Sequence, residues 1–377
     1  MGDDDPVLQA PDASLPPAAA DPPAPPVRPS RRGVVLGGSA ITTVLLLSVL
    51  AAAPAPYVVE SPGPTVDTLG DVDGEPLIGV SGAPTFPTDG ALRLTTVSVA
   101  GGPGTPVDAM RVVRGWLETD EAVVPQELVY PQGQSAQERE QLAAREMTTS
   151  QEDATAAALT ELGYAVPATV TVAGVVPDGP SDGVLAEGDV LVAVGGTEVV
   201  ELGDLTVALA AAPPGAELEV TVRRDGELRE LGLVTGDDGE GGSVLGVFID
   251  PVFAFPVDVT IRIDEIGGPS AGLMFALGIV DVLTPGALTG GVDVAGTGTI
   301  TVEGEVGPIG GIRQKIAGAQ RDGAAVFLVP EGNCGDVDGL GSPDLQLVRV
   351  GTLGEAVDAV TAVGEGRTDD LPSCESA

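Results

Sequence analysis

The hydrophobic and polar positions divide the chain into one long apolar run, several alternating stretches and a few amphipathic runs. Residues 33–53 form the apolar run and carry no charge. As a helix, this run is long enough to span about 30 Å of hydrocarbon, which predicts a transmembrane helix. Residues 1–32 are rich in Pro, Ala and Asp without periodicity, which predicts a disordered tail.

Basic residues on one side of the apolar run predict its orientation. Arg28, Arg31 and Arg32 precede it, so the positive-inside rule predicts a cytoplasmic N-terminus and an extracytoplasmic remainder. A cleaved signal peptide is the alternative, because Ala51–Ala53 suits a small-residue cleavage site. The run exceeds the usual apolar region of a signal peptide, about 7–15 residues, which favours an uncleaved, single-pass anchor in the cell membrane.

Residues 54–163 alternate strand-like stretches with turns and contain one helical insert. Residues 92–99 are strongly β-branched and lie between Gly90 and Gly101, as in a strand bounded by turns. Residues 135–162 are dominated by Gln, Glu, Ala and Leu. This composition predicts one or two solvent-facing helices that end at Gly163.

Residues 164–236 have a compact strand, turn and helix pattern. A β-branched strand at Val170–Val176 is followed by Leu185–Gly196, a helix at Leu202–Ala211 and a closing strand before Gly226. The order and spacing of Leu-x-x-Gly-Asp-Val-Leu and the later Val-x-Val-x-Arg resemble a bacterial PDZ domain.

The PDZ resemblance implies that an extended peptide or a protein C-terminus binds as an added strand. The groove would lie between the Thr169–Val175 strand and the Leu202–Ala211 helix. The Gly-Leu-Gly-Phe loop that binds carboxylates in this family is absent as such, and Leu162–Tyr164 is the nearest candidate. A β-domain that serves only as a spacer is the alternative.

A polar linker at 237–242 leads into a last domain at 243–366, followed by a tail at 367–377. Strand patterns at 257–263 and 324–329 alternate with helical patterns at 312–319 and 353–363. The chain is therefore predicted to be a multi-domain α+β protein: an N-terminal transmembrane helix, a β-rich PDZ domain and a C-terminal α+β domain.

Composition excludes several kinds of site. The sequence has no histidine, which removes Ser-His-Asp machinery and His-ligated metals. Its formal net charge of −39 should repel nucleic acid. We expect no cofactor. Cys334 and Cys374 could pair in an oxidising compartment, and the sequence leaves that open.

Lys315 is the single lysine of the protein, and Ser270 lies in Gly267–Gly272, just before an apolar helical run. A serine at a helix start faces free N–H groups, and the amides of Gly268 and Ser270 could stabilise an oxyanion. Lysine, unlike arginine, can lose its proton when buried. Without histidine, Lys315 is the candidate base. The alternatives are a capping serine and an exposed helix lysine.

Three motifs in order resemble the proteolytic domain of Lon (endopeptidase La). They are Gly-Pro-Ser-Ala-Gly, Ala-Gly-Thr-Gly-Thr-Ile-Thr and Gly-x-Val-x-Pro-Ile-Gly-Gly-Ile-x-x-Lys-Ile-x-x-Ala, within residues 255–330. The order of anchor, PDZ domain and Lon-type domain resembles the membrane-anchored PDZ–Lon-like peptidases of YlbL type. The resemblance implies that Ser270 is the nucleophile, Lys315 the general base, and Thr297 a group that orients the amine.

The resemblance also implies an ATP-independent endopeptidase that cleaves unfolded or extended segments. A phosphate-binding loop of the form G-x-x-x-x-G-K-[S/T] is excluded, because Ile316 follows the only lysine. Lon domains form rings, which implies a homo-oligomer. Gly267 departs from the acidic residue that many Lon domains carry there. An inactive membrane-anchored scaffold that binds peptides is the alternative function.

Overall fold

The computed structural model describes residues 31–130, 136–239, 241–263, 266–369 and 371–374. The protein divides between residues 52 and 53 into two compact units. The first contains α1 (Arg31–Ala52), whose Arg31–Val49 portion is long and apolar enough to cross a membrane. The predicted disorder of residues 1–32 falls almost wholly outside the described residues.

The second unit is built on a six-stranded mixed sheet with the order β22-β21-β18-β6-β2-β8. Strand β18 runs parallel to β6 and β21, β22 runs parallel to β21, and β2 runs antiparallel to β6 and β8. The strands span β2 (Tyr57–Asp67), β6 (Ala91–Ala100), β8 (Ala122–Pro125), β18 (Asp293–Gly296), β21 (Val326–Pro330) and β22 (Gln346–Val350).

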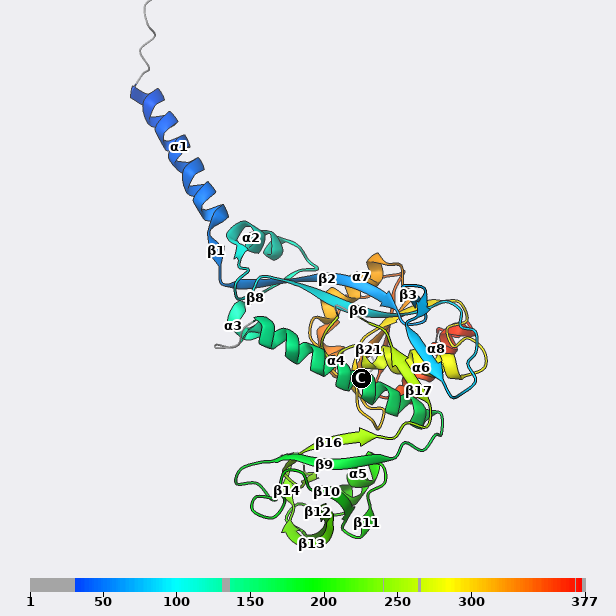
Figure 1. The fold of residues 1–377 in the computed structure, drawn as a ribbon. Helices are drawn as coiled ribbons and strands as arrows, with labels where there is room; N and C mark the ends of the chain where they lie inside the picture. The colour runs from blue at the N-terminus through cyan, green and yellow to red at the C-terminus, as the bar shows by residue number, and fades with distance from the viewer. Residues whose placement is uncertain (1–30, 131–135, 240, 264–265, 370, 375–377) are drawn as a thin grey trace, which may run out of the picture. The chain divides into compact units, whose positions relative to one another are not determined.

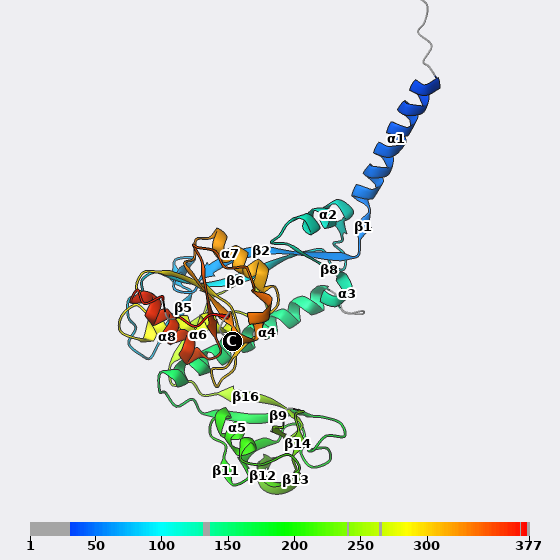
Figure 2. The same ribbon diagram turned by 180° about the vertical axis from the view of Figure 1, so that it is seen from behind.

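Helices cover both faces of this sheet (Figures 1 and 2). On one face, α4 (Ala136–Glu161), α6 (Gly272–Leu283) and α8 (Leu353–Gly364) enclose the largest apolar core. On the other, α7 (Ile312–Arg321) packs on side chains of alternate residues in β18 and β21. Eleven residues of α6 are buried, which explains why its sequence is apolar on every side apart from Asp281.

The structure corrects the predicted separate domain at 54–163. Strand β6 pairs with β18 in the register Leu92↔Val294, about 200 positions along the sequence, so residues 54–163 and 257–364 share one sheet and one core. Helix α4 belongs to that core through its alanines and Leu159, and is not solvent-facing all round. Alanine is only weakly hydrophobic, so the buried side of α4 differs little in hydrophobicity from its exposed side. The sequence pattern therefore did not reveal which side of the helix is buried.

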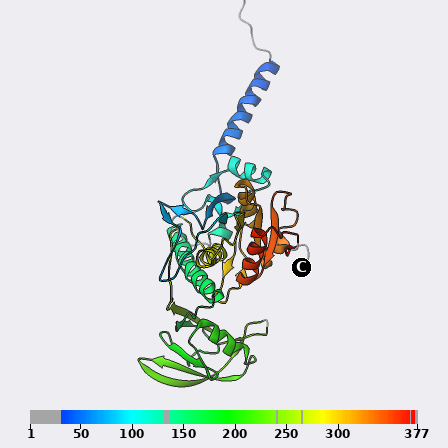
Figure 3. The same cartoon turned by 90° about the vertical axis from the view of Figure 1, so that its right-hand side faces the viewer.

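An inserted domain between α4 and β17 (Asp258–Ile261) forms a separate lobe, coloured green in Figure 3. Its sheet has the order β13-β12-β10-β9-β16 and packs on α5 (Leu202–Ala210) around its own apolar core. The elements are β9 (Ala168–Val175), β10 (Val190–Val194), β11 (Thr197–Glu198), β12 (Glu217–Arg224), β13 (Glu227–Val234), β14 (Gly236–Asp237), β15 (Ser243–Val244) and β16 (Val247–Phe253).

Strand β16 corrects both the end of the inserted domain and the position of its predicted groove. It pairs with β9 from Val247↔Val175 to Phe253↔Ala168, while β10 pairs with the other edge of β9. Both edges of the Thr169–Val175 strand are therefore occupied, and the outer edges of this sheet belong to β16 and β13. Strand β16 follows the Gly-rich segment 237–242, which looks like a linker between domains. The sequence pattern therefore placed this strand in the next domain.

The remaining short elements connect these parts. They are β1 (Pro54–Ala55), β3 (Asp71–Val72), β4 (Glu75–Pro76), β5 (Ile78–Ser81), β7 (Val107–Asp108), α2 (Ala109–Leu117), α3 (Gln126–Val129), β19 (Thr299–Ile300), β20 (Val306–Gly307) and the 3-10 turn η1 (Glu331–Asp336).

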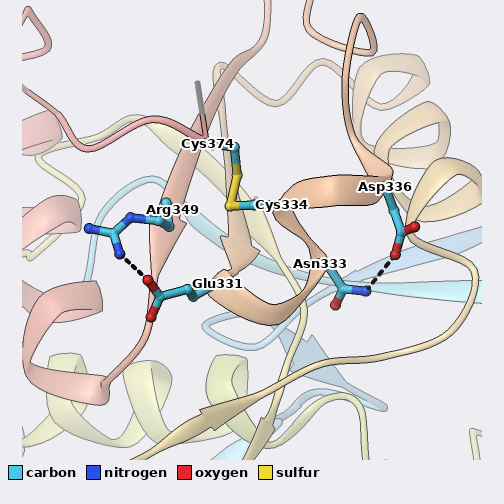
Figure 4. Close-up of a disulfide and its surroundings, with 6 residues drawn as sticks. All are labelled: Glu331, Asn333, Cys334, Asp336, Arg349 and Cys374. Atoms are coloured by element: carbon cyan, nitrogen blue, oxygen red, sulfur yellow. Dashed lines mark hydrogen bonds and ion pairs between the residues drawn. A yellow bond between two sulfur atoms is a disulfide. The ribbon is translucent and has the colours of Figure 1, made fainter. Parts of the chain in front are cut away.

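The two cysteines form a disulfide that ties the C-terminal segment to η1 (Figure 4). The Cα atoms of Cys334 and Cys374 are 5.0 Å apart, at a sequence separation of 40. An ion pair between Arg349 and Glu331 lies on the other side of the same turn. The disulfide closes a loop of the backbone that contains β22 and α8.

Removing this disulfide is expected to lower the free energy of unfolding by about 2–4 kcal/mol, because the loop it closes regains entropy in the unfolded state. Guanidinium unfolding of Cys334→Ser/Cys374→Ser measures the change. Wild-type protein unfolded with a reducing agent is the matched control and should show the same midpoint. A double variant as stable as the oxidised wild type would contradict the expectation.

Candidate active site

Ser270 lies at the N-terminal end of α6, one residue before the cap residue Ala271. Its carbonyl oxygen accepts hydrogen bonds from the Gly298 N–H at 2.9 Å and from Thr297 Oγ1 at 3.0 Å. These two bonds fasten the segment before α6 to the loop that follows β18. The serine is thus held between two elements and keeps its side chain on the surface of a cleft.

Lys315 is brought to Ser270 by α7. Its Nζ lies 2.7 Å from Ser270 Oγ and 2.9 Å from Thr297 Oγ1. Lys315 is 3% exposed and Thr297 is fully buried. The three predicted residues Ser270, Lys315 and Thr297 therefore meet in one hydrogen-bonded cluster.

Burial lowers the pKa of Lys315 from 10.5 to about 8. The cause is desolvation, because the Lys315 side chain is buried in the protein. Burial destabilises the charged form of an amine relative to its neutral form. A substantial fraction of Lys315 is therefore neutral in mildly alkaline solution, and a neutral amine at 2.7 Å can accept the hydroxyl proton of Ser270.

The helix that carries Lys315 is positioned by a glycine and a buried asparagine. Gly311 has φ +68° and approaches β6 so closely that a Cβ would lie 2.6 Å from Val97 Cγ2. Asn333, in η1, accepts from the Ile309 N–H at 2.8 Å and donates to the Ile309 carbonyl at 3.0 Å. Figure 4 shows Asn333 next to the disulfide. Asn333 was not predicted, although a polar residue three positions after a buried strand was a usable signal.

The backbone amides near Ser270 correct one prediction. The Gly268 N–H donates to the Ala143 carbonyl at 2.9 Å and is not available to an oxyanion. Within the described part of the protein, the Ser270 and Ala271 N–H groups have no hydrogen-bond partner. The Gly268 amide is therefore not the predicted oxyanion donor, and donation by the Ser270 amide stays a prediction.

Helix α4 supplies contacts that the sequence did not reveal. Ser150 Oγ donates to the Pro269 carbonyl at 2.9 Å. A Cβ at Gly267 would lie 2.8 Å from the Cβ of Ala143, so a side chain there has no room. The acidic residue that many Lon domains carry at this position is thus excluded by the packing of α4 against the loop.

A cleft of about 500 Å³ lies over the cluster. One wall is the segment Thr95–Val99 of β6, and another is formed by Met147 and Ile266. Strand β18 pairs with β6 only as far as Leu94, so the edge of β6 beyond that point faces the cleft without a strand partner. Within the described residues, no group of three His, Cys, Asp or Glu side chains could hold a metal ion.

Comparison with known proteins identifies both domains. Residues 261–362 match the family model of the Lon protease (S16) C-terminal proteolytic domain, and residues 138–234 match that of the PDZ domain. The protein combines a PDZ domain with a Lon-type proteolytic domain. Ser270, Thr297 and Lys315 all lie in the Lon-type match, and the domain order is consistent with the YlbL-type architecture.

Relatives of this protein include Lon proteases, which match it over a short part of their length. Lon protease 1 of Herpetosiphon aurantiacus is 40% identical over 94 residues, which cover 24% of the present sequence and 11% of that protein. The Lon protease of Mycolicibacterium smegmatis is 35% identical over 98 residues, 26% of the present sequence and 12% of that protein. The match thus spans about a tenth of the relatives' length.

The comparison with solved structures gives a partial match. The PDZ domain of an SdrC-like protein from Listeria monocytogenes aligns at 17% identity and a TM-score of 0.21, covering 22% of the present sequence and 86% of that one. The PDZ assignment rests on the family match and on the observed strand order.

Proposed function

We propose that the protein is a membrane-anchored, ATP-independent serine endopeptidase with a Ser–Lys dyad. The observation that carries the proposal is the 2.7 Å separation of Lys315 Nζ and Ser270 Oγ in a buried site. A hydroxyl and an amine at this distance are within proton-transfer reach. The Lon-type family of the surrounding domain supports the same chemistry.

In the proposed mechanism, neutral Lys315 takes the proton of the Ser270 hydroxyl as Oγ attacks the substrate carbonyl. The oxyanion accepts a hydrogen bond from the Ser270 N–H. The lysine ammonium then gives its proton to the leaving amine, and the peptide bond breaks. Lys315 next takes a proton from water as the water oxygen attacks the acyl ester. The lysine ammonium then returns this proton to Ser270 Oγ as the ester C–O bond breaks, which releases the acid product and restores the free serine and the neutral amine. Thr297 Oγ1, at 2.9 Å from Nζ, orients the amine throughout.

The substrates in this proposal are unfolded or extended segments. The free edge of β6 at Thr96–Val99 could pair with a peptide strand that lies across Ser270. The PDZ domain would capture peptide as a strand on β16, beside side chains of β16 and α5 that share one apolar core. A peptide on β16 would bind a strand that leads through β17 to the Ser270 loop.

Membrane anchoring is part of the proposal. Helix α1 has the length and apolar composition of a membrane span, and Arg28, Arg31 and Arg32 lie at its N-terminal side. The positive-inside rule then places the N-terminus in the cytoplasm and both domains outside it. The disulfide between Cys334 and Cys374 agrees with an oxidising compartment.

The test is the pH dependence of cleavage. Full-length protein in detergent is incubated with an unfolded fluorescent protein, with and without Mg-ATP. Because the neutral amine is the active form, and the pKa of Lys315 is about 8, the rate should rise with pH up to about 8 and level off above it. ATP should change nothing. A protein that cleaves nothing at alkaline pH, or whose rate is flat from mildly acid to alkaline pH, would contradict the proposal.

A further inference from the structure

Helix α2 presents its large apolar side chains to solvent. Met110, Val113, Trp116 and Leu117 are 57%, 45%, 63% and 78% exposed. At 100° per residue these four positions lie on one side of the helix, and Arg114 flanks them. An amphipathic helix on a soluble domain normally turns such a face inward, so this exposed face needs a partner.

The inner face of α2 carries small side chains that pack closely on the domain. The helix therefore cannot rotate to bury its large apolar side chains. Val112 is buried, and a Cβ at Gly115 would lie 2.8 Å from Val123 Cγ2. The Asp108 side chain caps the helix by accepting from the Arg111 N–H at 2.8 Å. The Arg111 guanidinium also pairs with Glu121. Close backbone approach to the sheet thus fixes which residues point outward.

The start of α2 is joined to the point where the backbone leaves the apolar helix. The Ala109 N–H donates to the carbonyl of Ala53, the residue directly after α1. Strand β7 also pairs with β1, with Ala55↔Val107 in register. Figure 1 shows α2 beside β1. If α1 spans a membrane, the first residue of α2 is hydrogen-bonded to the residue that directly follows the membrane-spanning helix.

An aromatic pair strengthens this assignment. Tyr57, shortly after β1, contacts Trp116 in an edge-to-face arrangement with ring centroids 6.1 Å apart. Tyr and Trp are enriched where a protein meets the lipid headgroups. The net charge of the protein is −39, so electrostatic attraction to anionic lipid does not favour membrane binding. The apolar face of α2 can instead bind lipid through hydrophobic contact.

We propose that the outward face of α2, formed by Met110, Val113, Trp116 and Leu117, docks into the lipid interface of the membrane that α1 crosses. This inference rests on the membrane anchoring proposed above. The partner is zwitterionic phospholipid at the boundary between headgroups and acyl chains. The contact is expected to resist salt, because it buries apolar side chains and neutralises no lipid charge.

Trp116 is the single tryptophan of the protein and reports on its own docking. Full-length protein is reconstituted into phosphatidylcholine vesicles, some of which contain lipid brominated near the headgroup end of the acyl chains. We expect brominated lipid to quench at least half of the Trp116 emission and acrylamide to quench little. The double variant Val113→Glu/Leu117→Glu should reverse both results, because two carboxylates on the exposed face oppose insertion without touching the inner face.

The matched control moves the tryptophan to the PDZ domain. In Trp116→Phe/Leu228→Trp, the probe sits on β13 at a position that is 63% exposed in the wild type. It should be quenched by acrylamide and not by brominated lipid. Flotation of each variant with the vesicles shows separately whether α1 still anchors the protein in the membrane.

Each outcome decides the proposal. A protein that floats with vesicles while Trp116 stays unquenched by brominated lipid overturns the docking and leaves the anchor intact. Protection from acrylamide that depends on protein concentration and not on lipid would assign the face to a second copy of the protein. Failure of the wild-type protein to float would overturn the anchor, and the docking with it.

Discussion

Replacing Ser270 by alanine, or Lys315 by arginine, is expected to lower kcat/KM on an unfolded protein by at least about a thousand-fold. Alanine removes the attacking oxygen. Arginine keeps the positive charge but does not release its proton in the working pH range. Both variants lose the 2.7 Å contact that starts the reaction. The two losses should not add in the double variant, because the residues act as one unit.

A neighbouring residue offers a matched control for Lys315. Arg313 lies on the same helix, two residues earlier, and its side chain is exposed. Arg313→Lys should keep full activity, and the same change added to Lys315→Arg should not restore it, because the new amine points away from Ser270. Circular dichroism confirms that each variant is folded. A Lys315→Arg protein with more than about a tenth of wild-type activity would exclude the lysine as base.

Sequence reasoning predicted the three polar residues of the site because the relevant motifs are local. Ser270, Thr297 and Lys315 each occur in a short, distinctive run, and the absence of histidine with a single lysine left few candidates for a base. The structure brings their atoms together. Their catalytic role remains a prediction for the kinetic experiments.

Long-range pairing explains what the sequence did not reveal. The partner of β6 lies about 200 positions downstream, and the partner of β9 follows a Gly-rich segment that looks like a linker. No local pattern encodes either pairing, so the domain boundaries at 163 and 236 were drawn where the pattern changed. The amide of Gly268 was misassigned for the same reason, because its acceptor, Ala143, belongs to α4.

The contact between α4 and the Ser270 loop has a direct functional consequence. Helix α4 touches this loop at three points: the Gly268–Ala143 hydrogen bond, the Ser150–Pro269 hydrogen bond and the close approach at Gly267. Helix α4 also precedes the first strand of the PDZ domain along the sequence. A disturbance at Gly267 should therefore reach the nucleophile three residues away.

Gly267→Ala is accordingly expected to reduce kcat about 10- to 100-fold with a smaller effect on KM, since small displacements of a reacting group carry costs of this order. The added methyl would lie 2.8 Å from the Cβ of Ala143, so either the loop or α4 must shift. Such a shift lengthens the Gly268–Ala143 hydrogen bond and moves Ser270 Oγ away from Lys315. Initial rates across substrate concentrations separate kcat from KM.

A second substitution tests the steric origin of that loss. Ala143→Gly removes the clashing Cβ and should restore most of the activity of Gly267→Ala, although glycine inside α4 costs about 1 kcal/mol of stability. Gly310→Ala is the matched control, because it also lines the cleft but its Cβ would meet nothing within 4 Å. Full activity of Gly267→Ala, or no recovery with Ala143→Gly, would show that α4 does not hold the nucleophile loop in place.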